Sequence, residues 1–101
     1  MMRIRFDNDY LFDLYKGRPV QGKPRFSQEV IKQFKKTIIQ LTSIQNIPAL
    51  YRVRNLNFEQ LNEGYYSVRV NKQYRIILTI DKDEILIEDI SVIEDLSKHY
   101  E

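Results

Sequence analysis

The most regular pattern of apolar and polar positions lies in residues 26–45, which read FSQEVIKQFKKTIIQLTSIQ. Apolar residues recur there every three or four positions, and at 100° per residue they form one stripe with Lys32 and Lys36 on the far side. Ser27 is a residue type that caps helix N-termini, and Phe26 is placed to pack against Ile31. The pattern therefore predicts an amphipathic helix that buries Val30, Ile31, Phe34, Ile38, Leu41 and Ile44.

A shorter helix is expected in the segment DNDYLFDLYKGRP. Asn8 or Asp7 can cap its N-terminus, and Gly17 and Pro19 are residues at which helices commonly end. The side chains that we expect to face inward are Leu11, Leu14 and Tyr15.

The hydrophobic period changes to two beyond Pro48, the residue that is expected to break the long helix. Residues 56–61, 65–70 and 74–80 alternate between apolar and polar positions, as does RIRF at the start of the chain. Residues 85–101 can form one long strand, or a strand followed by a short turn or helix. The order predicts one α+β domain over residues 1–101, in which two N-terminal helices pack on one face of an antiparallel β-sheet meander and leave the other face open.

The register of the hairpin YSVRVNKQYRIIL, residues 66–78, determines which side chains share that open face. A three-residue loop over 71–73 makes one face uniformly apolar and places Arg69 opposite Arg75, both pointing away from the core. Like charges directly opposite on a sheet are destabilising, and a bound anion would offset the repulsion. The same face is expected to carry the small polar residues Ser67, Asn71 and Thr79. Together with the two guanidinium groups, they would form a cradle that binds a phosphodiester. The alternative is that both arginines lie on an ordinary solvated face.

Charge is unevenly distributed along the chain, although the net charge is only +2. Residues 16–75 contain twelve Lys and Arg against three acidic residues, whereas residues 76–101 contain two against eight. A basic middle of this kind favours a polyanionic partner, with Lys32, Lys36 and Lys72 as further contacts, unless the charges form solvated faces only.

The absence of cysteine excludes a disulfide framework and a thiolate metal site. With a single histidine, only the carboxylates of the acidic end are left as metal ligands, and they lack a binding loop, so no metal or cofactor is expected. No run approaches the roughly 20 apolar residues of a membrane span, and the start lacks an apolar signal segment. We therefore expect a cytoplasmic protein without a membrane partner.

Four segments, LYKGRPVQGKPRFSQEVIKQFKK, LNFEQL, YYSVRVNKQYRIIL and DLSKHY, resemble the plasmid-maintenance killer proteins, the HigB-like toxins of the RelE superfamily. The resemblance covers nearly the whole chain in order. It implies a RelE-like fold and a metal-independent endoribonuclease that cleaves mRNA on the ribosome. It also implies a HigA-like helix-turn-helix antitoxin as partner, through which alone operator DNA would be contacted.

The resemblance also implies roles for individual residues. Arg75 matches the arginine that contacts the scissile phosphate, and Arg69 matches a basic position on the preceding strand. His99 corresponds to a C-terminal histidine that acts in acid–base chemistry, and Tyr100 is its neighbour. An imidazole suits proton transfer at neutral pH, but a solvated tail histidine is the alternative.

Some members of the family carry a histidine and a lysine before the hairpin, where this chain has Glu59 and Asn62. This departure leaves the general base open: Glu59 is a second candidate beside His99, or it is an ordinary strand carboxylate. A non-catalytic RNA- or ribosome-binding module on the same fold is the alternative function. Among the seven tyrosines, Tyr65 and Tyr100 are placed to stack on a base.

Overall fold

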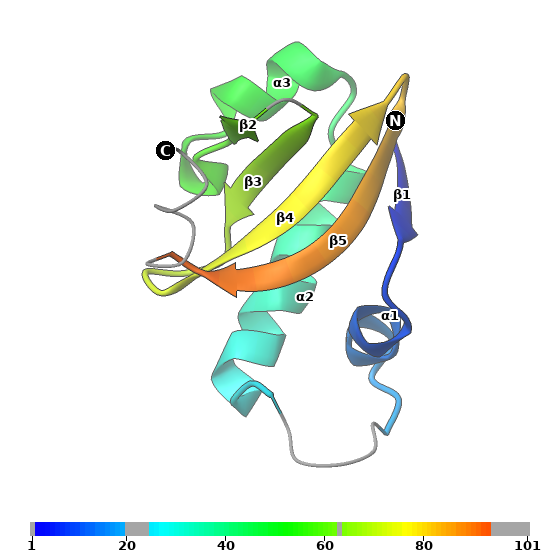
Figure 1. Ribbon diagram of the computed structural model, residues 1–101, viewed down its shortest axis with the longest axis vertical. Coiled ribbons are helices and arrows are strands. Elements are labelled where there is room, and N and C mark those ends of the chain that lie inside the picture. Colours follow the sequence, from blue (N-terminus) through cyan, green and yellow to red (C-terminus); the bar gives the residue numbers. More distant parts are fainter. Residues whose placement is uncertain (1, 20–24, 63, 94–101) are drawn as a thin grey trace.

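The structure is a computed structural model of the 101-residue chain, and it describes residues 2–19, 25–62 and 64–93. The elements in chain order are β1 (Arg3–Phe6), α1 (Asp9–Lys16), α2 (Gln28–Thr42), α3 (Ile47–Arg52), the 3-10 helix η1 (Arg54–Leu56), β2 (Glu59–Asn62), β3 (Tyr65–Arg69), β4 (Tyr74–Asp81) and β5 (Glu84–Val92). The expected α+β class is confirmed, with α2 running behind the sheet in Figure 1.

The five strands form one sheet in the order β1-β5-β4-β3-β2. Strands β2 to β5 pair antiparallel in sequence and form the expected meander. The sheet is nevertheless mixed, because β1 pairs in parallel with β5, from Arg3 beside Glu84 to Phe6 beside Ile87. The parallel pairing of this edge strand is a feature that the sequence did not predict. Ile4 and Phe6 pack against the core from this position, and that long-range packing favours the parallel partner.

Helices α1 and α2 begin at the capping residues that the sequence predicts. The side chain of Asn8 accepts a hydrogen bond from Leu11 N at 3.2 Å, and that of Ser27 accepts one from Val30 N at 3.2 Å. Helix α1 ends at Gly17, whose φ of 74° lies in the left-handed region that glycine adopts without steric cost. The local signals at these ends agree with the tertiary structure.

The segment after α2 differs from the sequence prediction. Pro48 lies in the first turn of the third helix, α3, where its fixed φ and missing N–H are tolerated. Asn46 caps that helix by accepting a hydrogen bond from Ala49 N at 3.0 Å. Pro48 thus starts a helix that the sequence analysis did not predict, and α2 already ends at Thr42.

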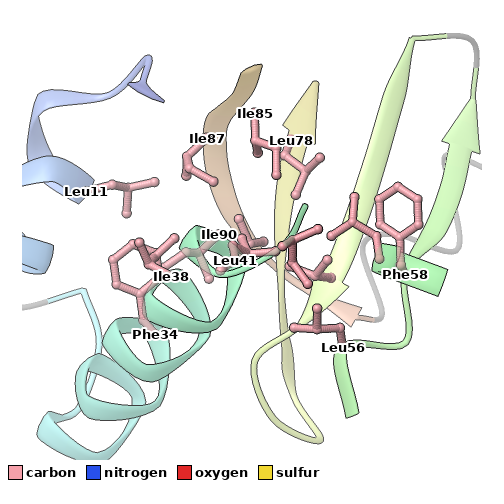
Figure 2. Packing of buried hydrophobic residues seen from close by; sticks show 14 of the residues in the cluster. Leu11, Phe34, Ile38, Leu41, Leu56, Phe58, Leu78, Ile85, Ile87 and Ile90 are labelled. Atoms are coloured by element: carbon pink, nitrogen blue, oxygen red, sulfur yellow. The ribbon is translucent and has the colours of Figure 1, made fainter. Parts of the chain in front are cut away.

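The core lies between α2 and the sheet (Figure 2). Phe34 and Ile38 of α2 are fully buried, as are Val68, Ile76 and Leu78 of the meander. Ile31 is only half-buried at the margin of this cluster. The predicted stripe of α2 and the predicted apolar face of the hairpin therefore pack against each other, and the opposite face of the sheet is left for other contacts.

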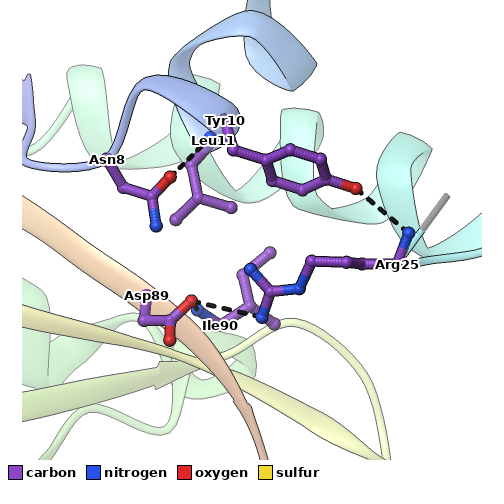
Figure 3. A network of polar contacts seen from close by, with 6 residues as sticks. All are labelled: Asn8, Tyr10, Leu11, Arg25, Asp89 and Ile90. Atoms are coloured by element: carbon purple, nitrogen blue, oxygen red, sulfur yellow. Dashed lines mark hydrogen bonds and ion pairs between the residues drawn. The ribbon is translucent and has the colours of Figure 1, made fainter. Parts of the chain in front are cut away.

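A cluster around Arg25 joins the start of α2 to α1 and β5 (Figure 3). The Arg25 guanidinium lies over the rings of Tyr10 and Phe26, with centroids at 5.4 and 4.9 Å. Its Nη2 is 3.5 Å from Asp89 Oδ1, and its backbone N–H donates to the Tyr10 hydroxyl at 3.1 Å. These contacts hold α1 and the start of α2 against the C-terminal half of β5, at Asp89.

Across the described ranges 2–19, 25–62 and 64–93, no helix has the length and apolar character needed to cross a membrane.

Candidate functional site

The pairing of β3 with β4 places two arginines side by side on the face that points away from the helices. Val68 pairs with Ile76, and both side chains are fully buried against the helices. Arg69 pairs with Arg75 one residue further along the hairpin, so both arginines project to the opposite face of the sheet. The register predicted from the three-residue loop is therefore confirmed.

Arg75 is the centre of this face, but it is buried rather than exposed on a solvated surface. Its relative exposure is 4 %, because neighbouring groups surround the guanidinium. Nε donates to Ser67 Oγ at 2.7 Å, and Nη2 donates to the carbonyl oxygens of Ser67, at 3.3 Å, and Asn57. These bonds fix the plane and direction of the guanidinium before any ligand arrives, as electrostatic catalysis requires.

Glu59 supplies a carboxylate beside this fixed cation. It is the first residue of β2 and pairs with Ser67 of β3, so its side chain lies on the same face. Glu59 Oε2 is 3.9 Å from Arg75 Nη2, and the Glu59 side chain is 43 % exposed. A half-exposed carboxylate next to a buried guanidinium can accept a proton from a ligand while the cation holds an adjacent phosphate oxygen.

Asn57 is a contributor to the site that the sequence analysis missed. It has φ 45° and ψ 53°, in the left-handed region, and this turn between η1 and β2 directs its carbonyl oxygen at Arg75. Asparagine is one of the few residues other than glycine that adopt this conformation. Residues 56–61 were expected to alternate as a strand, but the strand begins only at Glu59, because Leu56 ends η1 and Asn57 forms the left-handed turn. The asparagine in RNLNF was the available signal for this turn.

Two further predicted contacts are open to solvent on the hairpin of β3 and β4. Arg69 is exposed at the end of β3, and Lys72 is exposed in the loop that joins β3 to β4. Ser67 is fully buried, and its hydroxyl accepts from Arg75. The structure thus joins Ser67 and Arg75 by a hydrogen bond, and Arg69 and Lys72 are exposed cationic side chains toward the hairpin loop.

Asn71 was expected to join the same polar face, and the structure contradicts that placement. Its Oδ1 accepts from the backbone N–H groups of Gln73 and Tyr74, both at 2.8 Å, and its Nδ2 donates to Gln33 Oε1 of α2 at 3.0 Å. The carboxamide therefore stabilises the hairpin turn and ties it to the helix. An asparagine in a tight turn satisfies nearby backbone groups before it is available to a ligand.

Lys32 and Lys36 are exposed on α2, which packs on the other face of the sheet. They therefore do not share a surface with Arg75, and the basic middle of the sequence is divided between two sides of the molecule. This outcome follows from the fold, because the hairpin and the helix bury their apolar sides against each other and turn their charges in opposite directions.

Thr79 lies further along β4, in a different polar group. Its hydroxyl donates to Glu88 Oε2 at 3.5 Å. The pKa of Glu88 is raised, first by burial, then by the charge of Asp7 and a hydrogen bond with the Asp7 side chain, while the Thr79 hydroxyl lowers it. Thr79 therefore hydrogen-bonds to the Glu88 carboxylate, which lies beside Asp7, and does not belong to the predicted arginine cradle.

His99 and Tyr100, the two predicted catalytic residues at the C-terminus, lie outside the described residues. In the part of the chain that the structure describes, no three His, Cys, Asp or Glu side chains are grouped closely enough to hold a metal ion. Of the four predicted catalytic residues, the structure describes Glu59 and Arg75.

No protein-family model and no curated protein sequence matches this chain. Among solved structures, the chain is similar to the YoeB-YefM complex from Staphylococcus aureus, with a TM-score of 0.52 and 21% identity over 90% of this chain and 95% of that one. It is also similar to YafQ from E. coli strain BL21(DE3), with a TM-score of 0.51 and 12% identity over 95% of this chain and 98% of that one. At this level of identity the likeness is one of fold, and the chain has the RelE-like fold of these two structures.

Proposed function

We propose that this protein is the toxin of a type II toxin–antitoxin pair and that it acts as a metal-independent endoribonuclease on ribosome-bound mRNA. The observation that carries the proposal is the Glu59 carboxylate 3.9 Å from the oriented Arg75 guanidinium. Both groups lie on the face of the sheet that α2 does not cover. Phosphodiester cleavage without a metal needs a base, a fixed cation and an acid for the leaving oxygen, and Glu59 and Arg75 are suited to the first two roles.

The fold and the sequence resemblance support this proposal independently of the Glu59–Arg75 geometry. The chain shares its fold with YoeB, which was solved as a complex with YefM, and with YafQ. The resemblance to HigB-like toxins adds an antitoxin of the HigA-like helix-turn-helix class as the proposed partner, and the ribosome as the proposed place of action. Operator DNA would then be contacted through the antitoxin alone.

The proposed reaction is an in-line transesterification of the RNA backbone. Glu59 accepts the proton of a 2′-hydroxyl, and the 2′-oxygen forms a bond to phosphorus while the bond from phosphorus to the 5′-oxygen breaks. Arg75 stabilises the negative charge that develops on the non-bridging oxygens, and it does so best when its orientation is fixed in advance. A protonated group must donate to the departing 5′-oxygen, and we propose His99 for this step. The products carry a 2′,3′-cyclic phosphate and a 5′-hydroxyl.

The burial of Arg75 favours a second candidate function. A guanidinium that is 4 % exposed and bonded to Ser67 and Asn57 can also serve as a structural clamp between β2, β3 and β4. In that case the exposed Arg69 and Lys72 would bind RNA or the ribosome, and the chain would be a binding module without catalysis.

Expression of the chain without its partner distinguishes the two functions. The toxin should arrest growth, and transcripts from arrested cells should carry new 5′-hydroxyl ends. Glu59→Gln keeps the size of the side chain but removes the base, so it should abolish both effects, whereas Glu29→Gln on α2 is the matched control and should leave both unchanged. Growth arrest without new transcript ends, retained by Glu59→Gln, would support the binding module instead.

A further inference from the structure

A β-bulge in β2 changes the direction of Asn62. Gln60 pairs with Tyr66 of β3, but the next pair is Asn62 with Tyr65, so the register shifts by one residue and Leu61 lies in the bulge. Residues that pair across an antiparallel ladder project to the same face. The bulge therefore brings Asn62 to the face on which Tyr65 and Ser67 lie, and bulges of this kind often re-aim a side chain beside a site.

A cavity of about 390 Å³ lies at this bulge, on the same side of the sheet as Arg75. It is lined by Leu61, Asn62, Tyr65, Ile77, Asp89 and Ser91. Leu61 is 7 % exposed yet does not belong to the hydrophobic core cluster, so its side chain is buried at the cavity and not in the core. Tyr65 is a large aromatic side chain with 44 % exposure, which leaves part of its ring open.

The cavity is directly connected to the proposed cleavage site through the strand pairing. Glu59 pairs with Ser67, which in turn pairs with Ile77 in the cavity wall. Arg75 pairs with Ser91, another lining residue. Tyr65 is two residues before Ser67 on β3, which corresponds to about 7 Å along the strand. The cavity is thus next to the groups that would hold the phosphate.

We propose that this cavity binds one unpaired nucleobase of the RNA, the base adjacent to the phosphate held at Arg75. The proposal rests on the proposed function for the identity of the polymer. An apolar wall at Leu61 and Ile77 with an open phenol ring at Tyr65 suits a flat aromatic ligand, and unstacked bases of single-stranded RNA are commonly held on aromatic side chains.

The polar groups at the cavity suit the edge of a base. The Asn62 carboxamide offers both a donor and an acceptor, which is the pattern that base edges present. Asp89 is already engaged, since its Oδ1 accepts from Ile90 N at 2.8 Å and lies 3.5 Å from Arg25 Nη2, and we assign it no contact with the base. The nearby cations Arg69 and Arg75 favour an occupant that is attached to phosphates.

The test uses trinucleotides whose 2′-oxygens are methylated, so that they bind but cannot be cleaved. Four carry A, C, G or U at the centre, and a fifth has an abasic centre. Binding is followed by NMR of the full-length protein through the methyl groups of Leu61 and Ile77. The parent should bind at least one of the four more tightly than the abasic ligand, and both methyl groups should shift. Tyr65→Ala should weaken that binding by about 5- to 150-fold, the range for loss of one stacked base.

Two variants serve as controls for this measurement. Tyr65→Phe retains the ring and should bind as the parent does, whereas Tyr51→Ala removes a tyrosine that is 59 % exposed on α3, outside the cavity, and should also leave binding unchanged. Equal affinity for the abasic ligand, no binding of any trinucleotide, or parental affinity in Tyr65→Ala would each overturn the proposal. Base-dependent binding by a protein that cleaves nothing on ribosomes would instead refute the endonuclease while the base-binding cavity stands.

Discussion

Replacing Ser67 by alanine removes the oxygen that accepts the hydrogen bond from Arg75 Nε, and the consequence can be estimated from the structure. The Ser67 side chain is fully buried and Arg75 is 4 % exposed, so water cannot replace the lost acceptor. A hydrogen bond to a charged group contributes about 1.5–3 kcal/mol, and a buried charged donor left without its acceptor costs at least as much. We expect Ser67→Ala to lower the free energy of unfolding by about 1.5–3 kcal/mol.

A double-mutant cycle with Arg75→Met isolates this interaction, measured by urea unfolding followed by circular dichroism. Once the guanidinium is absent, Ser67→Ala should be close to neutral, because both partners of the bond have then been replaced by apolar groups. The same cost of Ser67→Ala in both backgrounds would refute the idea that the hydroxyl acts through Arg75. In the cleavage assay, Ser67→Ala should also reduce the rate, since Arg75 loses part of its orientation.

Three further predictions concern the fold around the site. Phe34→Ala in the core should lower the free energy of unfolding by about 3–5 kcal/mol, whereas Ile39→Ala, at a position 58 % exposed on the same helix, should change it by less than about 0.5 kcal/mol. Asn57→Ala should destabilise by about 1–2 kcal/mol in chemical denaturation, and Asn57→Gly should not, because the backbone there has φ 45°. Glu88→Gln should raise the melting temperature at pH 7 more than at pH 4. Because the folded-state pKa of Glu88 is raised, the parent loses stability as the pH rises above the unfolded-state pKa, whereas the neutral amide of the variant has no such loss.

The hairpin register was predictable because only one pairing places the alternating apolar residues of both strands on the same face. Val68 and Ile76 share the core face in that register, and this alone brings Arg69 opposite Arg75. The parallel partner of β1 was not predictable from RIRF, because four alternating residues fit many neighbours and the choice depends on packing with residues 84–87. Local patterns determine a register well and a distant partner poorly.

The surroundings of Arg75 were not predictable for a related reason. Its strand position indicates which face it lies on, but its burial depends on the carbonyl of Asn57, which is brought there by a left-handed turn 18 residues earlier. Asn71 shows the converse: it lies next to the hairpin strands, yet its side chain is used by the turn and by Gln33. The Glu59 position was identified as a candidate base, and its distance to Arg75 required the structure.

Single-turnover cleavage of ribosome-bound mRNA by the purified protein tests the central claim most directly. The parent should produce fragments with 5′-hydroxyl ends without added metal, and Glu59→Gln should slow that step by roughly 10² to 10⁴ while its RNA binding stays unchanged, as expected for loss of a general base. Arg75→Lys should also fail, because a point charge cannot reproduce the planar guanidinium that Ser67 and Asn57 orient. A folded Glu59→Gln protein that cleaves at the parental rate would contradict the account.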